Sequence, residues 1–131
     1  MKTILIDAVS ALIIETENGN FKIFKEMQEV LDKFPNKKII LTNADDDGFI
    51  KYGLNKAPYE IFTLKHKPEK TNPEYYKQML NYFKLTSDDV IYFEHGEEAV
   101  ISARSVGIKT YHWDNKTRPL KELHSFLEKN I

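Results

Sequence analysis

The stretch that decides the fold is Lys2–Leu12, with the sequence KTILIDAVSAL. Its apolar run Ile4–Ile6 is short and ends directly in the carboxylate of Asp7. A continuous apolar run of this kind, rich in β-branched residues, is typical of a strand buried on both faces of a parallel sheet. Open α/β sheets bind ligands in the crevice at the carboxyl ends of such strands. Asp7 is therefore the first candidate functional residue, and the alternative is that it merely ends the strand.

The rest of the chain alternates further apolar segments with amphipathic ones. We expect four more strands, at Lys38–Leu41, Tyr59–Leu64, Asp89–Phe93 and Lys109–Trp113. Apolar residues at helical spacing and helix-start signals predict helices at Phe21–Phe34, Asp46–Leu54, Asn72–Phe83, Ala99–Val106 and Leu120–Leu127. An Asn-Gly pair at Asn18 predicts a hairpin before the first helix. Alternating strands and helices imply right-handed crossovers, so we predict a three-layer α/β/α, Rossmann-like fold with a five-stranded parallel sheet.

Length and composition narrow the class of protein. The 131 residues, 41% of them hydrophobic, fit a single domain spanning residues 1–131. A formal net charge of -1 gives no electrostatic footprint for nucleic acid or for a membrane surface. The absence of cysteine excludes disulfides and thiolate metal sites. No apolar run approaches the length of a membrane span or of a signal peptide, so we expect a soluble, cytoplasmic protein.

Polar residues follow three of the predicted strands at their carboxyl ends. They are Asp7, the pair Thr42-Asn43 and the pair Glu94-His95, and the lysine-rich loop Lys65–Lys70 precedes the helix between the last two. Parallel strands bring these ends to one rim of the sheet. A carboxylate, a hydroxyl, an ammonium group and a second acid are the groups needed for phosphoryl transfer. The carboxylate attacks in line, while the hydroxyl, the lysine and a metal stabilise the charge on the phosphoryl oxygens.

The acidic run Asp45–Asp47 leaves two interpretations open. Three adjacent acids are candidates for a metal cluster, but acids also favour the first turn of a helix because of its positive end. We favour the helix start, since no metal-loop pattern with ligands at alternate positions follows.

The order of these segments resembles the haloacid dehalogenase-like (HAD) hydrolase superfamily over nearly the whole chain. Four motifs carry the resemblance: a strand ending in D-x-D-x-T, a strand ending in Thr-Asn, a lysine segment that opens a helix, and an apolar strand ending in acids before a small-residue helix. They correspond to Ile6–Leu12, Ile40–Asn43, Lys70–Tyr75 and Val90–Gly107. The resemblance implies the HAD-like fold without a large cap domain.

The resemblance also implies roles for individual residues. Asp7 corresponds to the nucleophile that forms an aspartyl-phosphate. Thr42, Asn43 and Lys70 correspond to the residues that bind and neutralise the phosphoryl oxygens. Asp7, Thr42 and Lys70 are therefore the expected catalytic residues.

The choice of the lysine is open among three neighbours. Lys65 and Lys67 are rivals of Lys70, and the alternative is that all three are solvated loop charges. We favour Lys70 because of its register with the helix start at Asn72-Pro73-Glu74.

A magnesium ion is the cofactor that the resemblance implies. Its ligands would be the side chain of Asp7, the backbone carbonyl of Val9 and the side chain of Glu94, with Glu97 or Glu98 as substitutes. The alternative for Glu97 and Glu98 is an ordinary acidic first turn of a helix.

Several positions depart from the motifs. The second acid of the first motif, the general acid/base of the family's phosphatases, is Val9, and its final threonine is Ala11. Loss of a positioned acid/base typically costs about 10²–10⁴-fold in rate. The magnesium-binding aspartate of the fourth motif is His95, and the acid four residues later is Ala99. Imidazole suits magnesium poorly, and we favour a hydrogen bond from His95 to a neighbouring acid or backbone group over metal ligation.

The residues between Asp7 and Thr42 leave room only for a hairpin and one helix, so we expect no cap and an open site. Such a site suits a phosphorylated substrate of large size or a protein partner. Two functions follow: a weak or specialised phosphohydrolase that works through Asp7, and a catalytically inactive HAD-like protein that serves as a binding module. A third, a dehalogenase, is less favoured because the cap and fourth-motif pattern of that branch are missing.

Overall fold

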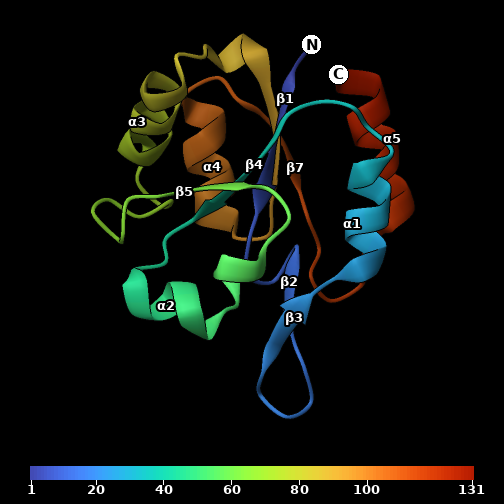
Figure 1. Ribbon diagram of the computed structural model, residues 1–131. Coiled ribbons are helices and arrows are strands. Elements are labelled where there is room, and N and C mark those ends of the chain that lie inside the picture. Colours follow the sequence, from blue (N-terminus) through green and yellow to red (C-terminus); the bar gives the residue numbers. More distant parts are fainter.

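The computed structural model describes residues 1–131 and contains a five-stranded parallel sheet between two layers of helices (Figure 1). The strand order in the sheet is β5-β4-β1-β6-β7. The strands are β1 (Thr3–Asp7), β4 (Lys38–Thr42), β5 (Glu60–Thr63), β6 (Val90–Glu94) and β7 (Lys109–His112). The five predicted strands are thus confirmed, each within about two residues of its expected bounds.

Each face of the sheet is covered by a pair of helices. The helices are α1 (Lys25–Asp32), α2 (Asp46–Lys51), α3 (Pro73–Phe83), α4 (Glu97–Ser105) and α5 (Leu120–Asn130), with short 3₁₀ turns η1 (Leu54–Lys56) and η2 (Ser87–Asp89). α1 and α5 pack on the face that carries Ile4 and Ile6, whereas α3 and α4 pack on the face that carries Leu5. This is the predicted α/β/α arrangement, because successive residues of β1 point to opposite faces.

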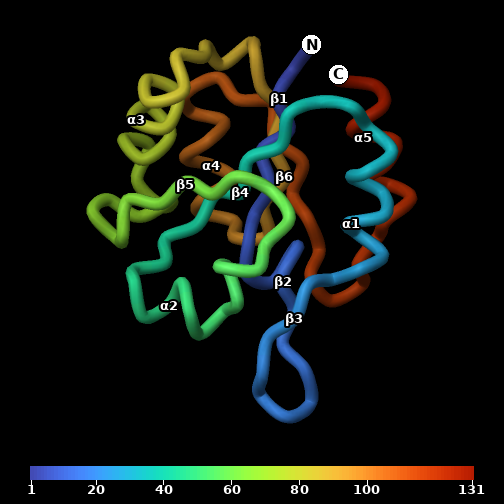
Figure 2. The backbone as a smooth tube through the Cα atoms, viewed as in Figure 1, coloured from blue at the N-terminus to red at the C-terminus, as the bar shows by residue number.

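β1 lies at the centre of the sheet and is buried over its whole length. Its register places Ile6 beside Ile40 of β4 and beside Phe93 of β6. Asp7, Thr42 and Glu94 therefore reach the same edge of the sheet. That edge lies at the end of the molecule opposite to both chain termini (Figure 2).

The segment after β1 differs from its prediction. The hairpin is present, as β2 (Ile13–Glu15) paired antiparallel with β3 (Phe21–Ile23), but the helix expected from Phe21 begins only at Lys25. The apolar residues of β3 fit a helical period as well as an alternating one, and strand pairing decides between them. The backbone N–H of Phe24 then donates to the carbonyl of Leu12 at 2.7 Å, which ends the hairpin.

Two predicted helix starts are confirmed. Asp45 caps α2 and accepts a hydrogen bond from the N–H of Gly48, so the acidic run opens a helix as expected. Asn72 caps α3 with Pro73 in the first turn. No helix of the structure has the length and apolar character needed to cross a membrane.

Candidate active site

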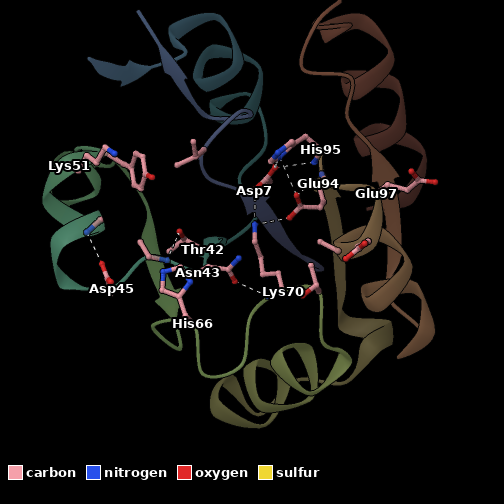
Figure 3. Close-up of a pocket in the computed structure, with 18 residues that line it drawn as sticks. Asp7, Thr42, Asn43, Asp45, Lys51, His66, Lys70, Glu94, His95 and Glu97 are labelled. Atoms are coloured by element: carbon pink, nitrogen blue, oxygen red, sulfur yellow. Dashed lines mark hydrogen bonds and ion pairs between the residues drawn. The ribbon is translucent and has the colours of Figure 1, made fainter. Parts of the chain in front are cut away.

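A pocket of about 840 Å³ opens at the carboxyl edge of the parallel sheet. Its lining includes all the predicted site residues: Asp7, Val9, Thr42, Asn43, Lys70 and Glu94. They come from the ends of β1, β4 and β6 and from the loops that follow β1, β4 and β5 (Figure 3). The strand order therefore assembles into one site residues that lie far apart in the chain.

Lys70 is the centre of the buried charge cluster. Its Nζ atom lies 2.7 Å from Asp7 Oδ1 and 2.7 Å from Glu94 Oε1 (Figure 3). The same atom donates to the carbonyl of Leu41 at 3.3 Å. The residue is only 7% exposed. The rival lysines, Lys65 and Lys67, are exposed on the surface. Among the three, Lys70 is the one that the fold directs to Asp7.

The backbone around Lys70 is held from two sides. Its N–H donates to Asn43 Oδ1 at 2.8 Å, which ties the loop to the end of β4. The side chain of Asn72 accepts a hydrogen bond from the first turn of α3, and Ser102 Oγ donates to the carbonyl of Thr71 at 2.6 Å. Asn43 thus positions the lysine loop, and its predicted contact with phosphoryl oxygens stays a prediction.

Glu94 is fixed by donors that the sequence prediction did not include. Tyr92 donates its hydroxyl hydrogen to Glu94 Oε1 at 2.5 Å, and the N–H of Gly96 donates to Glu94 Oε2 at 2.8 Å. Tyr76 OH lies 3.3 Å from Tyr92 OH. Side chains alternate between the two faces of a strand, so Tyr92 and Glu94 lie on the same face of β6. This alternation could have predicted their contact from the sequence.

His95 lies between the two carboxylates. Its backbone N–H donates to Asp7 Oδ2 at 3.0 Å, and its ring Nδ1 lies 2.5 Å from Asp7 Oδ2 and 3.3 Å from Glu94 Oε2 (Figure 3). Because ionised carboxylates only accept hydrogen bonds, Nδ1 carries the hydrogen. The favoured expectation of a hydrogen bond to a neighbouring acid is confirmed.

The side chains shift one another's pKa values. Burial, and after it the nearby carboxylate of Glu94, raises the pKa of Asp7 above its ordinary value. Burial acts against ionisation of Glu94 as well, but Lys70 and the donors around it hold the pKa of Glu94 well below its usual range. Despite burial, Asp7 and Glu94 raise the pKa of Lys70. Hydrogen bonds to Asp7 and then to Glu94 raise the pKa of His95 to about 10, so its ring is positively charged at neutral pH.

This arrangement does not fit a magnesium ion. Magnesium requires about six oxygen ligands in near-octahedral geometry. Both oxygens of Asp7 and both oxygens of Glu94 already accept hydrogen bonds from protein donors. The ring nitrogen of His95 lies where a cation shared by the two carboxylates would have to sit. With two acids and two bases, the formal charges of the cluster cancel without a metal.

The outer part of the pocket is open and mixed in charge. Thr42 is buried at its floor, where its Oγ1 accepts from the N–H of Ala44 at 3.2 Å. Val9 lines the pocket near Asp7 and offers no acid or base. The walls carry Lys51 and His66 from one side and exposed glutamates of α4 from the other. No cap covers the opening, since only the hairpin and α1 lie between β1 and β4.

The central strand of the parallel sheet ends in a carboxylate that binds a lysine, and solved structures of HAD-family enzymes share the fold of this sheet and its helices. The chain matches the D,D-heptose bisphosphate phosphatase of B. bronchiseptica, complexed with magnesium and phosphate, with a TM-score of 0.73 and 12% identity over 100% of both chains. The fold of this chain is therefore the HAD-like fold.

Two further solved structures show the same likeness. A putative β-phosphoglucomutase from Thermotoga maritima matches with a TM-score of 0.69 and 15% identity over 100% of both chains. A HAD family enzyme from Bacteroides thetaiotaomicron, complexed with magnesium and inorganic phosphate, matches with a TM-score of 0.67 and 14% identity over 88% of this chain and 96% of its own. The sequence itself matches no family model and no curated protein.

Proposed function

We propose that this protein is a HAD-like phosphohydrolase that works through an aspartyl-phosphate on Asp7. The observation that carries the proposal is the buried carboxylate of Asp7, held 2.7 Å from Lys70 Nζ at the floor of an open pocket. Burying this carboxylate is costly unless it is paired, and two cationic side chains are placed at the pocket floor to pair it. Solved structures of the same fold hold phosphate, which supports a phosphoryl group as the ligand.

The proposed reaction has two steps. Asp7 Oδ1, which accepts one hydrogen bond where Oδ2 accepts two, forms a bond to phosphorus. The ester P–O bond breaks, and its electron pair leaves with the alcohol oxygen, which takes a proton from water. Water then attacks the phosphorus of the aspartyl-phosphate, which releases inorganic phosphate and restores the Asp7 carboxylate. Lys70 and the hydroxyl of Thr42 stabilise the negative charge on the phosphoryl oxygens.

The absence of an acid at Val9 limits the substrates. No side chain at that position protonates the leaving oxygen, so the rate falls by about 10²–10⁴-fold for poor leaving groups. Esters and anhydrides whose leaving group is stable as an anion need no such proton. We therefore expect activated phosphates to be turned over and simple alkyl phosphates to be nearly inert. The open pocket accommodates a large phosphorylated substrate or a phosphorylated partner protein.

The test is hydrolysis of a panel of phosphoesters and acyl phosphates by wild type and by Asp7→Asn, each with magnesium and with a chelator. Asp88→Asn, which changes an exposed acid away from the pocket, is the matched control. We expect turnover and a trapped phosphorylated intermediate in wild type and in Asp88→Asn, and the loss of both in Asp7→Asn. Equal background from all three proteins contradicts catalysis.

A second function is favoured by a specific observation. Val9 removes the acid/base, and both oxygens of Asp7 are engaged by protein donors. The same pocket in a catalytically inactive protein would bind a phosphorylated ligand without turnover. Tight phosphate binding together with a silent hydrolysis panel would support this binding module.

A further inference from the structure

The buried charge cluster at the pocket floor contains one cation that phosphoryl chemistry at Asp7 does not by itself require. His95 is held by two hydrogen bonds to Asp7 Oδ2, one from its backbone and one from its ring. The same ring nitrogen lies 3.3 Å from Glu94 Oε2. The ligand atoms of Asp7, Glu94 and His95 lie within 4.8 Å of one another, close enough to share one cation. In this structure the ring of His95 itself bridges the two carboxylates.

We propose that the side chain of His95 takes the place of a divalent cation between Asp7 and Glu94, so that the pocket binds a phosphoryl group without metal. The inference rests on the proposed function, because it assumes that the pocket binds a phosphoryl group. It adds that the binding is independent of magnesium, in contrast to the solved structures of the same fold that hold magnesium together with phosphate.

The geometry of the two carboxylates leaves no place for a metal between them. A metal bound by both carboxylates needs their facing oxygens, and in this chain those oxygens accept hydrogens from His95 and Gly96. The 2.5 Å between His95 Nδ1 and Asp7 Oδ2 is a hydrogen-bond distance and leaves no room for an ion between the two atoms. A metal could enter only after the ring had left.

The acidic and basic side chains of the cluster are also equal in number. Lys70 and His95 together balance Asp7 and Glu94, so the empty pocket needs no further cation for neutrality. Either carboxylate left without its partner would be strongly destabilising in so buried a place. The two cations also provide the positive charge that a phosphoryl dianion requires at the pocket floor.

His95 can also be reached from the pocket. His95 lines the pocket, and a third of its side chain is exposed (33%). While Nδ1 is bound to Asp7, Nε2 has no hydrogen-bond partner in the chain. The protonated ring therefore has one N–H left to donate to a phosphoryl oxygen. A single residue would thus hold the nucleophile and donate to the ligand.

The experiment is calorimetric titration of the whole chain with inorganic phosphate, in a chelator and in excess magnesium. Wild type should bind phosphate with the same affinity in both conditions, within about twofold, because a metal that does not bind cannot shift the equilibrium. His95→Asn keeps a polar side chain but removes the charge, and it should weaken phosphate binding about tenfold or more in both conditions.

His95→Asp should make phosphate binding depend on magnesium. The new carboxylate at position 95 gives three acids around one point, a hard oxygen set suited to magnesium. Phosphate binding by this variant should be lost in the chelator and restored by magnesium, and magnesium should raise its melting temperature but not that of wild type. Lys121→Asp, at an exposed position of α5 outside the pocket, is the matched control and should behave as wild type.

The outcomes separate the two proposals. Wild type that binds phosphate only with magnesium overturns the role of His95 and leaves the proposed function intact. Wild type and variants that bind no phosphate in either condition overturn the proposed function and the inference with it. If His95→Asp does not fold, the comparison of wild type with His95→Asn in the chelator still decides.

Discussion

Lys70 is the residue on which the buried site depends. Two carboxylates share its ammonium group at 2.7 Å each, and the side chains of Asp7 and Glu94 are almost inaccessible to water. Lys70→Met keeps the length of the side chain and removes its charge. We expect the free energy of unfolding in urea to fall by about 3–5 kcal/mol, since a buried charge loses its partner. Adding Glu94→Gln should recover part of that loss by removing one unpaired acid.

The matched control is Lys65→Met. Lys65 lies in the same loop, but it is exposed and its partner Asp46 is a surface acid. Such pairs contribute about 0–1 kcal/mol, so this variant should unfold close to wild type. If both variants lost the same stability, the buried cluster would not be a stabilising feature of the fold.

The same residues show what the sequence could predict about the site. Asp7, Thr42 and Lys70 were predictable because each follows a strand or opens a helix, and parallel strands end at one edge. The bridging position of His95 was not predictable in detail. Its contacts depend on the side-chain direction at the start of α4, which spacing along the chain does not specify.

At the scale of elements, the start of α3 holds the lysine loop. Asn72 caps this helix two residues after Lys70 and accepts from the N–H of Glu74 at 2.9 Å. Asn72→Ala should lower the free energy of unfolding by about 1 kcal/mol, because a helix loses its N-cap. It should also weaken phosphate binding in calorimetry, since the loop that places Lys70 becomes less ordered.

Thr86→Ala is the matched control for that cap. Thr86 forms a capping box with Asp89 at η2 and does not line the pocket. This variant should lose a similar amount of stability while phosphate binding is unchanged. Weakened phosphate binding in both variants would show that general loss of stability, and not the helix start, affects the site.

The elements also mark where sequence prediction failed. The five strands and most helices were predictable from apolar runs and from capping residues such as Asn72. Phe21–Ile23 was predicted as helix and is a strand, because its partner Ile13–Glu15 supplies hydrogen bonds that a local pattern does not contain. Strand pairing depends on two segments, so the residues of one segment alone do not predict it.

At the scale of the whole molecule, one strand connects two cores. Leu5 belongs to the core under α3 and α4, whereas its neighbours Ile4 and Ile6 belong to the core under α1 and α5. Trp113 is the single tryptophan, is 1% exposed and packs in the core under α1 and α5. Its fluorescence therefore reports on the face of the sheet that Leu5 does not touch.

This placement gives a test of the predicted single domain. Leu5→Ala should lower the free energy of unfolding by about 2–5 kcal/mol, because it leaves a cavity in a closely packed core. If the two cores unfold as one unit, tryptophan fluorescence and far-ultraviolet circular dichroism should shift to the same lower urea midpoint. Ile6→Ala, on the other face of β1, should also give equal urea midpoints by fluorescence and by circular dichroism. A fluorescence midpoint that stayed at the wild-type value in Leu5→Ala would mean that the two faces unfold independently, and that β1 does not transmit stability from one core to the other.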